Sequence, residues 1–276
     1  MHTNDKIGSK VKDWAYSLFV EHPHLFLPIL ENQKPKGERE ATALERIFDE
    51  FDIPRGSKIL DLSCGIGRHS INLAKKGYQV VGYDPSPLYI EKAKQSAIDE
   101  LAGAQTEIRF YQAEACKVAE VLLANGESGF NAIIMFDSVG FVGEAQDIQM
   151  LTDIFKLAAT NCILVTETEN RDWIIRNLQP QVNLDFERLE IHEIWRFNLE
   201  TSVAESRSKF YEKNPNGTSL RLVLDLNTSL RLYSLHELIR IINLTGWKYI
   251  KSLGDILTLE PASSETPDIL TISRKI

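Results

Sequence analysis

The sequence of 276 residues has little of several features that define other classes of protein. It holds three cysteines, Cys64, Cys116 and Cys162, an odd number on predicted core segments with no metal-ligand spacing. We therefore expect free thiols and no metal site. No apolar run approaches the ~20 residues that a helix needs to cross a bilayer, and residues 1–6 lack the basic and apolar regions of a secretory signal. These absences predict a cytoplasmic protein without a membrane segment.

Basic charge is also scarce. Lys and Arg number 31 against 39 Asp and Glu, which gives a net charge of −8, and the only small basic clusters are residues 34–36 and 75–76. Proteins that bind nucleic acids concentrate Lys and Arg on one face, because counterion release supplies much of their affinity. The charge balance therefore disfavours a nucleic-acid partner and favours a small-molecule or protein substrate.

The most informative segment runs from Lys58 to Arg68. Its apolar residues Ile59, Leu60 and Leu62 predict a buried parallel strand. Gly65 and Gly67 follow, where the backbone can approach a ligand without an intervening Cβ, and a helix closed by Gly77 comes next. Strand, glycine turn and helix form the arrangement that binds a nucleotide-like group at the end of a parallel sheet.

The next predicted strand, residues 78–83, ends in Asp84. This carboxylate follows the first glycine by about twenty residues, where an acceptor for ribose hydroxyls is expected. A dinucleotide site needs a third glycine where Ser70 stands, and Asp61 at the strand end would repel pyrophosphate. S-adenosylmethionine (SAM) carries an ammonium, a sulfonium and no phosphate, so the pattern favours SAM over NAD.

Residues 59–68 and 80–86 resemble the first two motifs of the class I SAM-dependent methyltransferases, although Ser63 stands where that family usually has glycine. The similarity runs from about residue 53 to 165 and returns at 231–238 and 246–247. It implies an α/β fold with a doubly wound, mostly parallel seven-stranded sheet. We expect further strands at 108–111, 130–136, 162–166, 247–253 and 269–273, with helices at 87–101, 146–159 and 235–244.

Alternation of apolar and polar residues between 183 and 232, with an Asn-Gly turn at 216–217, predicts three or four antiparallel strands inserted after the fifth parallel strand. This insertion is either a lid over the site or a dimer surface. The expected organisation is an N-terminal helical cap and linker (1–37, the linker at 33–37), a SAM-binding core (38–180), the β insertion (181–233) and a C-terminal helix with edge strands (234–276). The helix at 10–30, broken at Pro23 and Pro28, either packs on the domain or covers the cofactor with Trp14, Tyr16 or Phe19.

The resemblance also implies the cofactor residues. Asp61 and the turn would face the methionine part of SAM and Asp84 its ribose. Glu114 is a candidate for the adenine amino group or else a solvated acid, and Arg68 binds a carboxylate or is a cation on the helix surface. The predicted cofactor-binding residues are Asp61, Ser63, Cys64, Gly65, Gly67, Arg68, Asp84, Pro85, Glu114, Ala115 and Phe136.

Substrate residues are expected where the fourth and fifth strands end and on the inserted strands. The candidates are Asp137, Ser138, Arg171, Trp195, Arg231 and Tyr233. No catalytic residue is assigned, because in-line methyl transfer mainly requires orientation of the two reactants, and a base only if the acceptor is protonated. The absence of an Asn/Asp-Pro-Pro-Tyr motif after the fourth strand disfavours methylation of DNA or of a glutamine amide.

The sequence therefore predicts a SAM-dependent methyltransferase that acts on a small molecule. Methylation of RNA or protein is the alternative within enzymes. A SAM-binding regulatory protein without catalysis is the alternative of another class.

Overall fold

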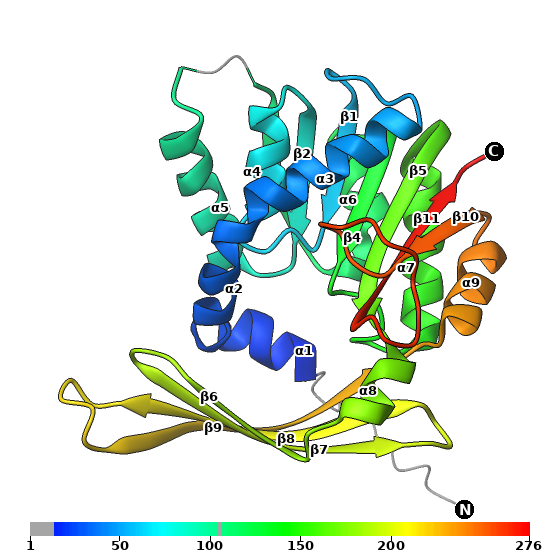
Figure 1. The fold of residues 1–276 in the computed structure, drawn as a ribbon. Helices are drawn as coiled ribbons and strands as arrows, with labels where there is room; N and C mark the ends of the chain where they lie inside the picture. The colour runs from blue at the N-terminus through cyan, green and yellow to red at the C-terminus, as the bar shows by residue number, and fades with distance from the viewer. Residues whose placement is uncertain (1–13, 104–105) are drawn as a thin grey trace, which may run out of the picture.

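The computed structural model describes residues 14–103 and 106–276, whose strands form two separate sheets (Figure 1). In these residues, seven strands form sheet A in the order β10-β11-β5-β4-β1-β2-β3, with only β11 antiparallel to its neighbours. The predicted doubly wound, mostly parallel sheet is therefore confirmed. Its strands are β1 Lys58–Leu62, β2 Gln79–Asp84, β3 Ile108–Gln112, β4 Phe130–Phe136, β5 Ala158–Glu169, β10 Lys248–Leu253 and β11 Asp268–Arg274.

Helices cover both faces of sheet A, which is why its central strands are apolar throughout. One core cluster joins the sheet to α3 Gly37–Glu50, α4 Arg68–Lys75 and α5 Pro87–Glu100. A second joins it to α6 Val118–Ala124, α7 Glu144–Leu157 and α9 Leu235–Leu244. The predicted helices are present, whereas α6, α8 Arg171–Asn177 and the 3₁₀ turn η4 Ala115–Lys117 were not predicted, being too short to show a clear helical period.

The N-terminal segment is a chain of short helices, consistent with proline breaks at residues 23 and 28. It comprises α1 Trp14–Tyr16, the π-helical turn η1 Ser17–Glu21, the 3₁₀ turn η2 Pro23–Leu25, α2 Leu27–Gln33 and the 3₁₀ turn η3 Lys34–Lys36. The part of the predicted helix at residues 10–13 lies outside the described residues. The expected polar linker at 33–37 is wrong, because this stretch is helical and leads directly into α3. Gly37 is buried so closely that a Cβ would lie 2.8 Å from the Arg68 carbonyl oxygen.

Sheet B is the insertion predicted from the alternating pattern. It follows β5 and α8 and has the antiparallel order β6-β7-β8-β9. The expected Asn-Gly turn lies between β8 and β9, with Gly217 at φ +66°. Its strands are β6 Gln181–Asp185, β7 Leu189–Asn198, β8 Val203–Lys213 and β9 Leu220–Arg231.

Sheet B lies across the carboxyl edge of the parallel strands, with the N-terminal helices between the two sheets (Figure 1). Leu18 and Leu25 of the helices pack with Leu189, Ile191 and Phe210 of sheet B in a third apolar cluster. The Trp14 indole donates a hydrogen bond to the Ser229 carbonyl (3.0 Å). We call the described N-terminal helices and sheet B together the cover.

Two of the three cysteines, Cys64 and Cys162, are buried, as expected. Cys116 is exposed, so its predicted core position is wrong; it lies on the short turn η4 rather than on a core strand or helix. In the described part of the chain, every helix is too short or too polar to span a bilayer.

Candidate functional site

A cavity of about 400 Å³ lies where the carboxyl edge of sheet A meets the cover. The cover contributes Phe19, Phe26, Leu30 and Gln33 from the N-terminal helices and Leu230 from sheet B. Of the three aromatic residues weighed as a cap, Phe19 faces the cavity, Trp14 stacks on the lining residue Phe141, and Tyr16 is exposed. The structure brings these predicted site residues to the cavity wall: Ser63, Cys64, Gly65, Arg68, Asp84, Pro85, Ala115, Phe136, Asp137 and Ser138.

The glycine turn passes through left-handed backbone conformations. Gly65 has φ +53° and Gly67, which precedes α4, has φ +82°. Ser63 has φ +61°, although a side chain there costs roughly 1–2 kcal/mol. Ser63 therefore adopts a left-handed conformation that favours glycine, and the turn is strained there.

Asp84, at the end of β2, faces the turn as predicted. Its two carboxylate oxygens accept backbone N–H groups, from Gly65 (2.9 Å) and from Ser86 (2.9 Å). Burial raises the pKa of Asp84 to about 6, against the lowering effect of these two hydrogen bonds. Each oxygen keeps lone-pair capacity toward the cavity, as a pair of ribose hydroxyls requires.

Asp61 is not among the cavity-lining residues. It is buried beneath the turn, where the Ser70 hydroxyl donates a 2.5 Å hydrogen bond to its carboxylate. Burial raises the pKa of Asp61, while His69, Ser70 and Arg68 act in the opposite direction. Asp61 therefore does not lie where it could contact a ligand in the cavity directly. Ser70 stands at the position where a dinucleotide-binding turn would need a third glycine. Its hydroxyl joins Asp61 to the first turn of α4.

Arg68 is not a freely solvated surface cation. Its guanidinium donates to Gln33 (2.7 Å) and lies 3.2 Å from the Glu40 carboxylate. His69 also meets Glu40 (2.8 Å) and packs its ring against Phe136, with 4.5 Å between centroids. His69 lines the cavity although it was not among the predicted residues. The sequence could have indicated His69 by its position after Arg68, on the helical turn that follows the glycines.

Glu114 is not among the residues that line the cavity. Its side chain is about half exposed and lies 3.8 Å from Lys117, which matches the interpretation of a solvated acid. Ala115, the next residue, does line the cavity. Of the two residues predicted at the adenine edge, only Ala115 therefore belongs to the cavity wall.

Carboxylates gather where β4 and β5 end. Asp137, which has φ +49°, and Glu169 both line the cavity. Burial, followed by the nearby Asp137, Asp268 and Glu193, raises the pKa of Glu169 to about 7. Glu169 belonged to the segment expected to set substrate specificity but was not singled out. The available signal was its position at the carboxyl end of the fifth parallel strand.

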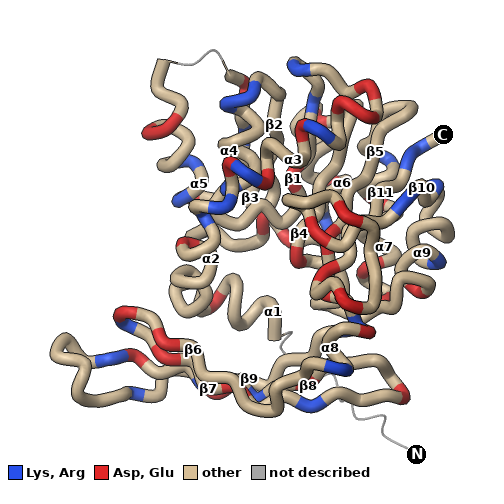
Figure 2. Tube along the Cα trace, viewed as in Figure 1, with Lys and Arg blue, Asp and Glu red and all other residues tan. Residues whose placement is uncertain are grey.

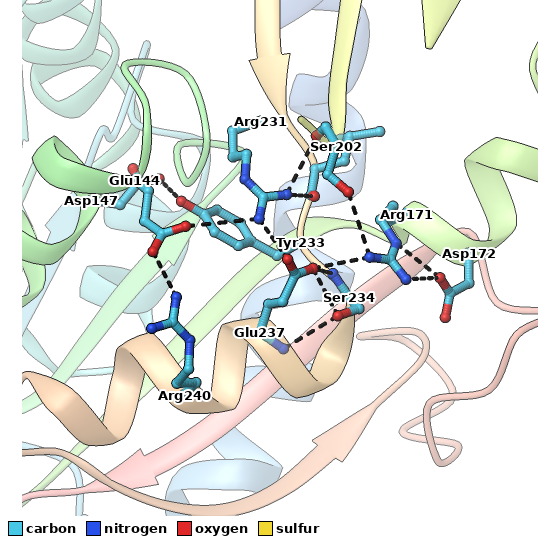
Figure 3. Close-up of polar contacts among 11 residues, drawn as sticks. Glu144, Asp147, Arg171, Asp172, Ser202, Arg231, Tyr233, Ser234, Glu237 and Arg240 are labelled. Carbon is cyan, nitrogen blue, oxygen red and sulfur yellow. Dashed lines mark hydrogen bonds and ion pairs between the residues drawn. The ribbon is translucent and has the colours of Figure 1, made fainter. Parts of the chain in front are cut away.

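The other predicted substrate residues lie elsewhere. Arg171, Trp195, Arg231 and Tyr233 are not among the residues that line the cavity. Trp195 donates its indole N–H to Glu193 on the same strand (3.1 Å). The remaining three take part in a polar network that joins sheet B to the core (Figure 3).

Glu237 of α9 is the centre of this junction. Its carboxylate receives Arg231 from β9 (2.6 Å) and Arg171 from α8 (3.0 Å), and it closes a capping box with Ser234 (Figure 3). Tyr233 donates to the buried Asp147 of α7 (2.6 Å). The side chains of Arg171, Arg231 and Tyr233 are thus used in holding the two sheets together, a role that their spacing in the sequence did not indicate.

Comparison with known proteins agrees with this geometry. Residues 59–161 match the methyltransferase domain family. A solved SAM-dependent methyltransferase from Clostridium acetobutylicum ATCC 824 has a similar fold, with a TM-score of 0.72, 12% identity, and coverage of 92% of this chain and 98% of that one. The predicted class I methyltransferase fold is confirmed by this likeness.

The curated relatives align with this chain over a smaller share of their length than the solved structure does. The chain is 38% identical over 61 residues to the 23S rRNA (uracil(1939)-C(5))-methyltransferase RlmD of Shewanella amazonensis, which is 22% of this chain and 14% of that protein. It is 27% identical over 149 residues to the putative methyltransferase YqeM of Bacillus subtilis, covering 53% of this chain and 56% of the relative. The chain therefore spans only a small part of the rRNA methyltransferase and about half of YqeM.

Proposed function

Because residues 59–161 match the methyltransferase domain family and the chain has the class I methyltransferase fold, we propose that this protein binds SAM and transfers its methyl group to a small-molecule acceptor. The observation that carries the proposal is Asp84 at the glycine turn, a buried carboxylate that faces the cavity at the expected distance along the chain. SAM supplies a methyl group already activated by the sulfonium.

The residues of the cavity fit this cofactor. Asp84 would accept the ribose hydroxyls, and the turn from Ser63 to Gly65 would lie along the methionine part. Ala115 and Pro85 would form the edge of the adenine site, with Phe136 on the methionine side. These assignments rest on the lining of the cavity and on the absence of a basic cluster suited to pyrophosphate.

The chain's own contribution to the reaction is orientation and exclusion of water. The cover supplies Phe19, Phe26 and Leu230 to the cavity, and an apolar wall there would hold acceptor and methyl in line away from solvent. Such positioning contributes up to roughly 7–11 kcal/mol to a two-reactant step. We treat residues 181–233 as the lid of the site and residues 38–180 as the cofactor-binding core.

A small-molecule acceptor is favoured over RNA. The net charge is −8, and the cavity wall carries Asp137 and Glu169 where an acceptor would approach. Carboxylates at this position repel a phosphate backbone, which instead requires Lys and Arg. The rRNA methyltransferase resembles only a short stretch of the chain, so its acceptor is not a guide here.

Calorimetric titration with SAM, S-adenosylhomocysteine and NAD tests the cofactor. We expect binding of the first two and none of NAD; binding of NAD alone would contradict the proposal. Asp84→Ala should weaken SAM binding at least tenfold, since hydrogen bonds to a charged group contribute about 1.5–3 kcal/mol. If the alanine variant fails to fold, Asp84→Asn is the substitute, because its side chain has the same shape and removes the charge. Asp49→Ala, an exposed acid on α3, is the matched control and should leave affinity unchanged.

A further inference from the structure

Four carboxyl groups meet at the edge of sheet A beside the cavity. Asp137 follows β4, Glu167 and Glu169 end β5, and Asp268 begins β11. The register places Asp268 opposite Glu169, and Glu167 opposite Phe136, a residue of the cavity wall. We call these four residues the edge carboxylates. In Figure 2, acidic segments gather along the part of the core that faces sheet B.

None of the edge carboxylates has a side-chain hydrogen bond or an ion pair with another residue of the described ranges, 14–103 and 106–276. Of the four, Glu167 is buried, Asp268 is partly buried, and Asp137 and Glu169 are exposed residues of the cavity wall. The buried acids Glu127 and Glu40, in contrast, are paired, Glu127 with Lys58 (2.7 Å) and Arg109 (3.0 Å) and Glu40 with Arg68 and His69. A buried carboxylate without a partner costs several kcal/mol, so Glu167 is expected only where something else compensates its charge.

Glu167 is the most deeply buried of the edge carboxylates. Only 9% of it is exposed, it has no partner among the described side chains, and it shares a face of the sheet with Phe136 of the cavity wall. Burial and the neighbouring Asp137 raise its pKa well above the ordinary range. The Ser138 hydroxyl, also on the wall, is a buried group with no hydrogen-bond partner in the described structure. Ser138 on the wall and Glu167, which is not among the lining residues, are thus polar side chains at this edge with no partner in the described structure.

The charges of the surrounding elements do not neutralise this cluster. Arg68 and His69 from α4 are engaged with Glu40, and Lys36 from η3 is exposed and acts only at a distance. Asp255 acts on Asp268 from the loop after β10.

Sheet B adds a further acid, Glu193. It acts electrostatically on Glu169 and is itself held by the Ser208 hydroxyl (2.8 Å) and by Trp195. Glu169 therefore has acidic neighbours in the core and in sheet B.

We infer that the methyl acceptor is a small amine that binds as its ammonium ion, whose charge the edge carboxylates balance. The ammonium would pass a proton to Asp137 or Glu169 on the cavity wall, and the freed nitrogen lone pair would attack the methyl carbon as its bond to sulfur breaks and S-adenosylhomocysteine leaves. This inference rests on the proposed function, since it names the acceptor of the same site. Within the described residues, no group of His, Cys, Asp and Glu has an arrangement that could hold a metal ion, which points to an organic cation. Asp137 and Glu169 reach the cavity directly, while Glu167 and Asp268 lie behind them in the sheet and add to the field.

The first experiment uses SAM with a radiolabelled methyl group and a metabolite extract divided at pH 7 on a cation exchanger. We expect labelled product only from the retained, cationic fraction. Label arising only from the flow-through would overturn the inference and leave methyl transfer intact. No transfer from either fraction, with SAM binding intact in calorimetry, would overturn the proposed activity and this inference with it.

The second experiment changes one edge carboxylate. Glu169→Gln should raise the apparent KM for the retained fraction at least tenfold, with SAM affinity unchanged within twofold. Glu169→Asp, which keeps the charge, should recover part of the loss. Glu265→Gln, an exposed acid far along the surface loop, is the control and should change neither value.

A readout independent of activity follows from charge repulsion. Without a bound cation, Glu169→Gln should raise the melting temperature at pH 8, where Glu169 is ionised beside Asp137 and Asp268, and should change it little at pH 5, where Glu169 is protonated. A residue with a purely structural role would lose stability on substitution. A fall in melting temperature at pH 8, or an unchanged KM, would overturn the inference.

Discussion

Ser63 has a Cβ but occupies a backbone conformation that favours glycine. It holds φ +61° in the cofactor turn, a conformation that costs a residue with a Cβ roughly 1–2 kcal/mol and costs glycine almost nothing. A glycine at this position would lower the stability of the folded state by roughly 0.5–1 kcal/mol, because its unfolded chain has more conformational freedom. This entropy cost partly cancels the gain from relieving the strain.

We predict that Ser63→Gly raises the free energy of unfolding by about 0.5–1 kcal/mol, measured by urea denaturation. Ser63→Ala is the control, because it keeps the Cβ and with it the strain. If the alanine variant gains as much as the glycine variant, the strain at this position is not the cause.

At the scale of elements, the junction between sheet B and the core depends on backbone contact as well as on charge. Gly140 has φ +94°, and a Cβ on it would lie 2.1 Å from the Arg231 carbonyl oxygen, so only glycine allows β9 to lie this close to the loop after β4. The Gly140 N–H donates to Asp147, which Tyr233 also reaches. The contact aligns Arg231 with Glu237, whose position in α9 is fixed by the capping box.

Glu237 makes the junction sensitive to acid. Burial favours the neutral carboxyl, but Ser234 and Arg231 outweigh it and lower the pKa of Glu237 to about 2. A group with a lowered folded-state pKa stabilises the protein above its ordinary pKa, near 4.5, and loses that contribution as the pH falls toward 2.

Glu237→Gln should therefore lower the free energy of unfolding at pH 7 by roughly 2 kcal/mol, and the difference from the unmodified protein should shrink between pH 5 and pH 2. Denaturation curves across this range measure it. Glu91→Gln, an exposed acid on α5, is the control. A difference that is the same at pH 7 and pH 2 would mean that ionisation of Glu237 does not stabilise the junction.

At the scale of the whole molecule, the site exists because two layers close on each other. Sheet A supplies the turn and the carboxylates, and the cover supplies apolar wall (Figure 1). Within the cover, the apolar cluster around Phe210 and the hydrogen bond from Trp14 to Ser229 join the N-terminal helices to sheet B. The Tyr89 hydroxyl of α5 donates to the Pro23 carbonyl (2.9 Å) and joins the cover to the core. Residues that do not line the cavity therefore control it.

Phe210→Ala should lower the free energy of unfolding by about 3 kcal/mol and also weaken SAM binding, although Phe210 does not line the cavity, because the cover loses its apolar contact. Calorimetry on the folded variant measures the second effect. Ile194→Ala, on the same sheet with a 60% exposed side chain, should change neither quantity. Unchanged SAM affinity in Phe210→Ala would mean that the cover does not support the cofactor site.

The sequence by itself determined the parallel core, the glycine turn and the antiparallel insertion. Apolar runs, glycines and alternation are local properties, and each element follows from the periodicity of its own residues. The position of Asp84 at the end of β2 could be predicted for the same reason, since a strand fixes where its last residue lies. The helical stretch at 33–37 was mistaken because its polar residues gave no apolar period, while packing on Arg68 kept it helical.

Only the tertiary structure decided what the acidic and basic residues do. Arg231 and Arg171 looked like ligand-binding cations but meet Glu237. Glu169 and Asp268, from distant segments, lie opposite each other in the sheet without a counterion among residues 14–103 and 106–276. Charge pairing depends on which strands and helices become neighbours in space, and local sequence periodicity carries no information about that.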